Sequence, residues 1–111
     1  MRQWLVDPIL LCRQHLLGEH VEHHMFVGTI TKGISVNGYL RDGLLEPETL
    51  YSRHAQLVNE MTRRGYNHKS PLLHVDTSHL PKGKIDIDRN IVDLKRRCKE
   101  CAMRIERHEA R

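Results

Sequence analysis

The chain has 111 residues, which favours one domain that spans residues 1–111 around one modest core. Lysine and arginine outnumber aspartate and glutamate by 18 to 14, which gives a formal net charge of +4. No apolar run approaches the ~18 residues of a membrane span, and an odd number of cysteines (three) is typical of a reducing compartment, so we expect a soluble, intracellular protein without a membrane partner.

The charge is unevenly distributed. Residues 1–48 carry four Lys/Arg against six Asp/Glu, whereas residues 49–111 carry fourteen against eight. A basic segment of this size favours an anionic partner, most often nucleic acid. The alternative is that the charge only keeps a small protein soluble, and the charge balance does not separate the two interpretations.

The first predicted helix covers residues 7–33. Asp7 can cap it, Pro8 suits its first position, and Gly33, or earlier Gly28, can end it. The following "GISVNGYLRDGLL" (33–45) contains the turn-forming pairs Asn-Gly and Asp-Gly and could hold a short hairpin.

A second helix is predicted from "EPETL" to a stop at Gly65, with Pro47 in its first turn. Its apolar stripe has a period near 3.6 and consists of Leu50, Ala55, Leu57, Val58 and Met61. A long connection with two prolines follows, and the segment 85–111 then predicts a third helix. Its apolar residues recur at steps of three and four: Ile87, Ile91, Leu94, Cys98, Cys101 and Ile105. The expected fold is all-α, with three main helices and long connecting loops.

Two groups of residues raise the question of a metal site. Cys98 and Cys101 form one C-x-x-C pair, but no second pair stands at zinc-finger spacing, and both lie on the apolar stripe, so core packing is favoured over a metal or redox function. His20 and His24 are four residues apart and could share a metal on one helix face, although exposure or a core hydrogen bond explains them equally simply. We expect no metal and no cofactor.

The stretch "RQHLLGEHVEHH" (13–24) also suggests acid/base chemistry. At about 100° per residue, His15, Glu19 and Glu22 share one arc of the first helix. Carboxylates close to each other and to a histidine raise each other's proton affinity, as acid/base sites require. A face of salt bridges to Arg13 or to a neighbouring helix accounts for the same pattern.

Two segments resemble a known family. "MRQWLVDPILLCRQHLLGEHVEHH" resembles the N-terminal catalytic segment of the pyrimidine-dimer DNA glycosylase/AP lyase family, the phage endonuclease V type, and "LYSRHAQLVNEMTRRGYNHKSPL" resembles its second major helix and the loop after it. The resemblance implies that the α-amine of Met1 is the nucleophile and that Glu22 moves protons. It also implies a set of DNA contacts: Arg2, Gln14, His15, Lys69 and Ser70.

The position of the nucleophile at the chain start makes chemical sense. A free α-amine has a pKa near ~8 and lysine one near ~10.4, so roughly a tenth of the amine is neutral at pH 7. Such an amine can attack the anomeric carbon of a sugar, expel the base and leave an imine, after which β-elimination cuts the strand. Initiator methionine is normally retained before a bulky residue such as Arg2, although phage members use a threonine amine.

The resemblance therefore implies a monomeric DNA glycosylase with AP lyase activity on UV-damaged duplex DNA. The expected lesions are pyrimidine dimers. It would be cytoplasmic and nucleoid-associated, or encoded by a virus and active in the host cell. Val21 and Met25 stand where phage members carry arginines. One Trp and one Phe supply few groups that could stack on bases. The resemblance therefore supports the cutting chemistry more directly than the identity of the lesion. The alternatives are a noncatalytic DNA-binding protein of the same fold and, less favoured, a metal-binding regulator.

Overall fold

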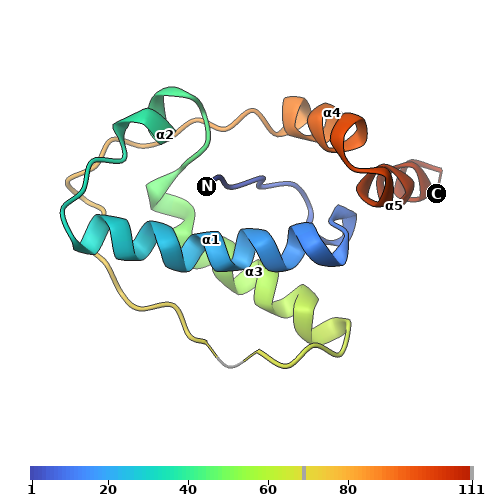
Figure 1. Cartoon of the computed structure of the whole chain (residues 1–111), viewed down its shortest axis with the longest axis horizontal. Coiled ribbons are helices and arrows are strands. Elements are labelled where there is room, and N and C mark those ends of the chain that lie inside the picture. The colour runs from blue at the N-terminus through green and yellow to red at the C-terminus, as the bar shows by residue number, and fades with distance from the viewer. Residues whose placement is uncertain (69, 111) are drawn as a thin grey trace.

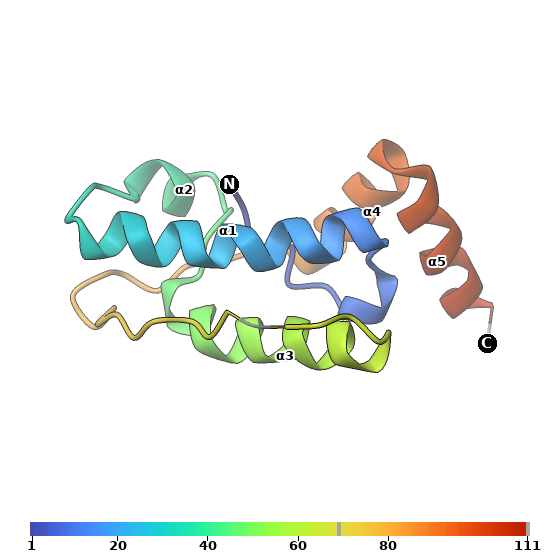
Figure 2. The same ribbon diagram turned by 60° about the horizontal axis from the view of Figure 1, so that its bottom comes forward.

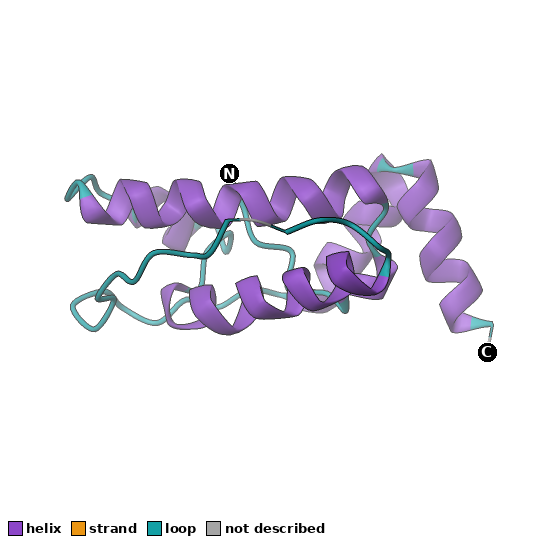
Figure 3. Cartoon of the chain, turned by 90° about the horizontal axis from the view of Figure 1, so that it is seen from below, coloured by secondary structure: helices purple, strands orange, loops and turns teal. Residues whose placement is uncertain are grey.

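A computed structural model describes residues 1–68 and 70–110, and the fold class predicted from the sequence is confirmed (Figure 1). Within these residues the chain forms helices and loops and no strand, as Figure 3 shows by colour. The α-helices are α1 (Arg13–Thr31), α2 (Asn37–Arg41), α3 (Leu50–Arg63), α4 (Ile87–Arg97) and α5 (Lys99–Glu109), and two short 3-10 helices are η1 (Pro8–Leu10) and η2 (Pro47–Thr49).

The first predicted helix begins later than its sequence signals suggest. Asp7 does act as a cap, because its carboxylate accepts the N–H of Ile9 at 3.1 Å, but it caps η1 and not α1. Leu11 and Cys12 then have extended backbone dihedrals, and the side chain of Cys12 caps α1. The predicted end is correct, since α1 stops at Thr31 and Gly33 follows with a φ of +72°, a conformation that favours glycine.

The segment 33–45 forms α2 and not a hairpin. Val36, Tyr39 and Leu40 are spaced like one face of a helix, and all three pack against the core beneath α2. Gly43 supplies a φ of +69° just after the helix, where its N–H donates to the carbonyl of Leu40. The two turn signals therefore mark the ends of a short helix.

Helix α3 follows η2 and ends before Gly65, whose φ is +84°, as predicted. Only part of its predicted apolar stripe is buried. Leu50, Leu57 and Met61 belong to the core, Val58 is half-buried and Ala55 is exposed. Three polar residues of α3 are buried in addition: Arg53, His54 and Glu60. Arg53 and His54 face polar groups of α1, whereas Glu60 accepts hydrogen bonds from Arg63 and Arg64 at the end of α3.

The last segment forms two helices where one was predicted. Cys98 has extended backbone dihedrals (φ −133°, ψ 111°), so it ends α4 and caps α5. Leu94, Cys101 and Ile105 are buried as predicted, whereas Ile87 is exposed. The break turns α5 away from the direction of α4 and lets both helices pack on the N-terminal half (Figure 2).

Helices α1 and α3 lie side by side, and the first residues of the chain run through the middle of the molecule (Figures 1 and 2). Two apolar clusters form the core. One surrounds Trp4, Leu11, Leu16 and Leu94, and the other surrounds Phe26 beneath α2. The connection 66–86 runs beside α1 and α3 (Figure 3), where some of its apolar residues cover the second cluster. Among the described residues no helix is long and apolar enough to cross a membrane.

Candidate active site

The second peptide unit of the chain is anchored by Gln3, which is completely buried. Its backbone N–H donates to the carbonyl of Leu44 at 2.8 Å, and its side-chain oxygen accepts the N–H of Glu46 at 2.7 Å. Its amide nitrogen donates to Thr49 Oγ1 at 3.1 Å and lies 3.0 Å from Nε2 of His23. Contacts to α1 and to the residues before α3 thus fix the backbone two residues from the chain start.

This anchoring places the chain start beside Glu22 on α1. A carboxylate oxygen of Glu22 accepts the backbone N–H of Arg2 at 3.3 Å, and Glu22 is half-buried. Met1 is also half-buried and packs against the second apolar cluster. The structure therefore brings together three residues singled out from the sequence, Met1, Arg2 and Glu22.

The side chain of Arg2 is held in a defined position. Its guanidinium lies 3.7 Å from the centre of the Trp4 ring and donates to Oδ1 of Asn90 at 2.7 Å. The amide of Asn90 in turn donates to the Trp4 carbonyl at 2.7 Å. Burial, and then the charge of Arg97, lowers the pKa of Arg2 from its usual value. Its Nε is buried and has no hydrogen-bond partner among the described residues.

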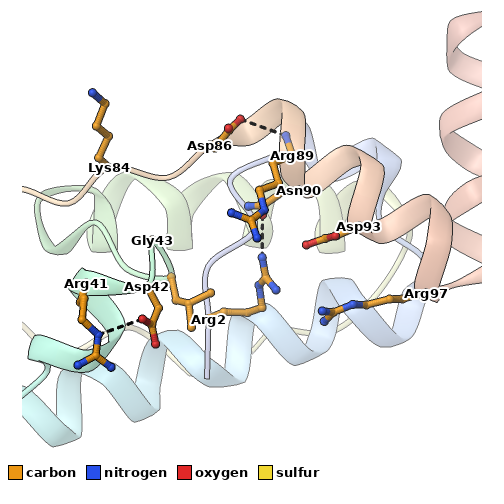
Figure 4. Close-up of a pocket in the computed structure, with 11 residues that line it drawn as sticks. Arg2, Arg41, Asp42, Gly43, Lys84, Asp86, Arg89, Asn90, Asp93 and Arg97 are labelled. Atoms are coloured by element: carbon orange, nitrogen blue, oxygen red, sulfur yellow. Dashed lines mark hydrogen bonds and ion pairs between the residues drawn. The ribbon is translucent and has the colours of Figure 1, made fainter.

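Arg2 also lines an open cavity of about 490 Å³ between α2 and α4 (Figure 4). Its walls carry five cationic side chains, Arg2, Arg41, Lys84, Arg89 and Arg97, against three carboxylates, Asp42, Asp86 and Asp93. Arg41 is bonded to Asp42 at 3.1 Å, so part of the positive charge is already paired. The remaining excess of positive charge suits an anionic ligand.

Sequence reasoning missed most of this cavity. Asn90 and the cations of α4 come from the opposite end of the chain to Arg2, and no motif links them. The sequence signal for it was the excess of positive charge over residues 49–111. It indicated an anionic partner without showing which arginines would gather beside the chain start.

The predicted acid/base arc on α1 does not form as one face. Glu19 is completely buried, and its two oxygens accept hydrogen bonds from Nε and Nη2 of Arg53 at 2.7 and 2.9 Å. The third Arg53 nitrogen, Nη1, donates to the carbonyl of Val6 at 2.6 Å. The alternative of a salt bridge to a neighbouring helix is therefore the correct one for Glu19. Glu22 alone of the two glutamates faces the chain start.

The other predicted DNA contacts within the described residues lie in different surroundings. Gln14 is exposed on α1, and Ser70 is exposed in the connection 66–86, whereas Lys69 lies outside the described residues. His15 is half-buried, with Nδ1 3.2 Å from the sulfur of Cys12 and its ring edge-on to Trp4. The DNA contacts of these residues stay predictions.

Several histidines near the site are held neutral by burial. Burial lowers the pKa of His23, whose Nδ1 lies 2.8 Å from the carbonyl of Glu19. Burial lowers the pKa of His20 and of His54 to about 4, and neighbouring histidines lower both further. His20 and His54 lie between α1 and α3, and neither contacts the cavity beside Arg2.

Comparison with known proteins gives one finding. A family model described as pyrimidine dimer DNA glycosylase matches residues 1–74. The match covers the chain start, α1 and α3, and it ends before α4, which supplies Asn90. No curated protein and no solved structure matches the chain.

Proposed function

This chain belongs to the pyrimidine dimer DNA glycosylase family, and we propose that it removes the damaged base with the α-amine of Met1 and then cuts the strand as an AP lyase. The observation that carries the proposal is the hydrogen bond from the Arg2 backbone N–H to Glu22 at 3.3 Å. It sets a carboxylate one residue away from the chain's α-amine. The proposed substrate is UV-damaged duplex DNA that contains a pyrimidine dimer.

The proposed reaction has two stages. The neutral amine of Met1 attacks C1′ of the damaged nucleotide, a C1′–N bond forms, and the bond between C1′ and the base breaks as the base leaves. The sugar ring opens to an imine between Met1 and C1′. The imine acidifies the C2′ proton, whose loss expels the 3′ phosphate and breaks the strand.

We propose that Glu22 serves both stages. As a carboxylate it stabilises the positive charge that develops on the sugar when the base leaves. It can also carry protons between the amine, the sugar oxygen and the C2′ carbon. Both carboxylate oxygens of Glu19, the other glutamate of the arc, accept hydrogen bonds from Arg53, so Glu19 is not proposed for this role.

The cavity beside Arg2 supplies the proposed phosphate contacts nearest the reaction. Arg2 lines this cavity together with Arg89 and Arg97, which come from α4 in Figure 4. Phosphate contacts position a protein on the duplex without reading sequence. Gln14, His15, Lys69 and Ser70 remain the proposed contacts farther from the chain start.

The proposal is tested by trapping the imine. Untagged protein is mixed with duplex DNA that holds one abasic site, and borohydride is added to reduce the imine to a permanent crosslink. We expect a crosslink at Met1 that is lost when the amine is acetylated. Glu22→Gln should cut the strand at least a hundredfold more slowly, because general acid–base catalysis contributes about that much or more.

Glu106→Gln is the matched control, because Glu106 is an exposed glutamate on α5, and it should behave like the parent protein. Binding without a crosslink or a strand cut would reject the enzyme and favour a noncatalytic DNA-binding protein. A crosslink at a lysine would reject Met1 as the nucleophile. A pyrimidine-dimer duplex, used in the same assay, tests the proposed lesion.

A further inference from the structure

Two short segments with the same local geometry meet where α1 and α5 begin. Cys12 and His15 begin α1, and Cys98 and Cys101 begin α5. In each pair the first cysteine caps its helix, and its sulfur accepts the backbone N–H of the residue three positions on, at 3.4 Å in both cases. Both capping residues have extended backbone dihedrals.

The four side chains point at a common centre. The Cys12 sulfur lies 3.8 Å from that of Cys98, and Nδ1 of His15 lies 3.2 and 3.6 Å from the sulfurs of Cys12 and Cys101. One ligand atom from each residue lies within 4.8 Å of the others. Zinc held tetrahedrally at about 2.3 Å from sulfur and about 2.0 Å from nitrogen sets two sulfurs about 3.8 Å apart and sulfur and nitrogen about 3.5 Å apart.

We propose that Cys12, His15, Cys98 and Cys101 bind one structural Zn²⁺ ion. Three thiolates and one imidazole complete the coordination of a closed zinc site. Binding releases the three thiol protons and leaves His15 bound through Nδ1. None of the three cysteines forms a disulfide, so all three sulfurs are available as ligands.

The surroundings suit the charge of such a site. Three thiolates and one Zn²⁺ carry a net charge of −1. The N-terminal ends of α1 and α5 both lie at the point where the four side chains meet. The positive end of a helix dipole favours a thiolate. A cavity beside Cys12 is lined by five arginines: Arg13, Arg63, Arg64, Arg104 and Arg107.

The ion would join the two parts of the chain. Cys12 and Cys98 are 86 residues apart, and the family match ends at residue 74, so two ligands lie inside the matched region and two outside it. The zinc would hold α5, and with it α4, against the first helix. This proposal departs from our sequence-based expectation of no metal, because the spacing of Cys98 and Cys101 gave no hint of Cys12 and His15 as partners.

The test is metal analysis of the purified reduced protein together with its cobalt(II)-substituted form. We expect bound zinc, and in the cobalt form a strong near-ultraviolet absorption from sulfur to cobalt. Cys98→Ser should lose this absorption or reduce it by about a third or more. His15→Cys keeps four ligands, so it should keep the metal and increase the absorption.

His108→Ala, which changes an exposed histidine on α5, is the control and should leave the metal and the spectrum unchanged. No sulfur-to-cobalt absorption in the parent protein would overturn the proposal. If Cys98→Ser does not fold, His15→Cys provides the test. A cobalt spectrum of His15→Cys identical to that of the parent protein would exclude His15 as a ligand and overturn the four-residue site.

A different observation carries a second, independent metal site. His20 and His24 of α1, His54 of α3 and His68 of the following connection have ring centres 4.8 to 5.4 Å from their neighbours. Nε2 of His20 and of His68 is buried without a hydrogen-bond partner among the described residues. Nε2 of His24 lies 3.3 Å from that of His54. Buried imidazole nitrogens rarely stay unpartnered.

We infer that these four histidines bind a second divalent ion, with Zn²⁺ as the probe, because imidazole is a preferred ligand of that ion. One ligand nitrogen from each lies within 4.8 Å of the others. The ion would fasten residue 68 to the seam between α1 and α3. It would thus fix the start of the connection 66–86.

Zinc content separates this site from the first one. His24→Ala and His68→Ala should each lose one zinc per chain, while the sulfur-to-cobalt absorption stays unchanged. His79→Ala, an exposed histidine on the same connection, is the control. Unchanged zinc content in both variants would overturn the four-histidine site and leave the cysteine site untouched.

Discussion

Arg53 and Glu19 form a two-point ion pair that is almost completely excluded from solvent, with side-chain exposures of 2% and 0%. The pair joins α3 to α1. Removing one partner leaves an uncompensated buried charge, so Arg53→Ala should lower the free energy of unfolding by about 3–5 kcal/mol. Chemical denaturation followed by circular dichroism measures the loss.

The double variant Arg53→Met, Glu19→Leu is the matched control. It removes both charges and keeps apolar volume, so it should be markedly more stable than Arg53→Ala. A loss below about 1 kcal/mol in Arg53→Ala would mean that water reaches Glu19 and that the pair is not buried in solution.

Glu60 gives the fold an acid-sensitive contact between α3 and the first residues. Its carboxylate accepts hydrogen bonds from Arg63 and Arg64, and Arg64 also donates to the Leu11 carbonyl at 2.7 Å. The bond from Arg63, and then that from Arg64, lowers the pKa of Glu60 below its usual value, against the opposing effect of burial.

Because the folded state lowers this pKa, the stabilisation is complete above the pKa of the unfolded chain and is lost as the pH falls through the folded value. Glu60→Gln should therefore lower the free energy of unfolding at pH 7, by about 1–3 kcal/mol, and change it little at pH 2–3. Urea denaturation at several pH values tests this, and equal losses at both ends of the range would contradict it.

Gly83 lies where the connection to α4 passes close to the backbone before α3. A Cβ atom at this position would lie 2.0 Å from the Leu45 carbonyl oxygen, which is backbone and cannot move aside as a side chain can. Gly83→Ala should lower the melting temperature, at a cost of about 1–3 kcal/mol.

Gly28 is the matched control, because it lies inside α1 and a Cβ there meets nothing within 4 Å. Gly28→Ala should raise the stability by up to about 1 kcal/mol, since alanine favours a helix interior more than glycine. An unchanged or raised melting temperature in Gly83→Ala would show that the close approach at Gly83 is absent in solution.

Asn90 holds Arg2 in place, so its loss should weaken DNA binding without touching the proposed nucleophile. Asn90→Ala removes a hydrogen bond to a charged group, and we expect about tenfold weaker binding of an abasic duplex. Fluorescence anisotropy at several salt concentrations measures the affinity. Asn59→Ala, an exposed position on α3, is the control. Unchanged affinity of folded Asn90→Ala would mean that Arg2 does not contact DNA.

Much of the fold could be predicted from local signals. Gly33 and Gly65 end their helices as expected, because positive φ values at these positions are set by glycine itself. The start of α1 and the break at Cys98 could not be predicted in this way. In both places a cysteine sulfur caps the helix, and cysteine is not among the usual capping residues.

The candidate site was predictable where it is close to the chain start and hidden where it is not. Met1, Arg2 and Glu22 follow from the resemblance, and the structure brings them together. Asn90 contacts Arg2 only because α4 folds back over 88 residues, and single-chain periodicity contains no information on such contacts. Glu19 looked equivalent to Glu22 on a helical wheel, but its partner Arg53 lies on another helix.

The contact between Arg2 and Asn90 also bears on how the protein is made. Residue 2 is translated 88 residues before its partner. A growing chain that ends before α4 would have Met1 and Glu22, but its Arg2 would lack the hydrogen bond to Asn90. The surroundings of the proposed nucleophile are therefore assembled only after α4 has been synthesised, and a chain that stops before α4 should have little capacity to cut DNA.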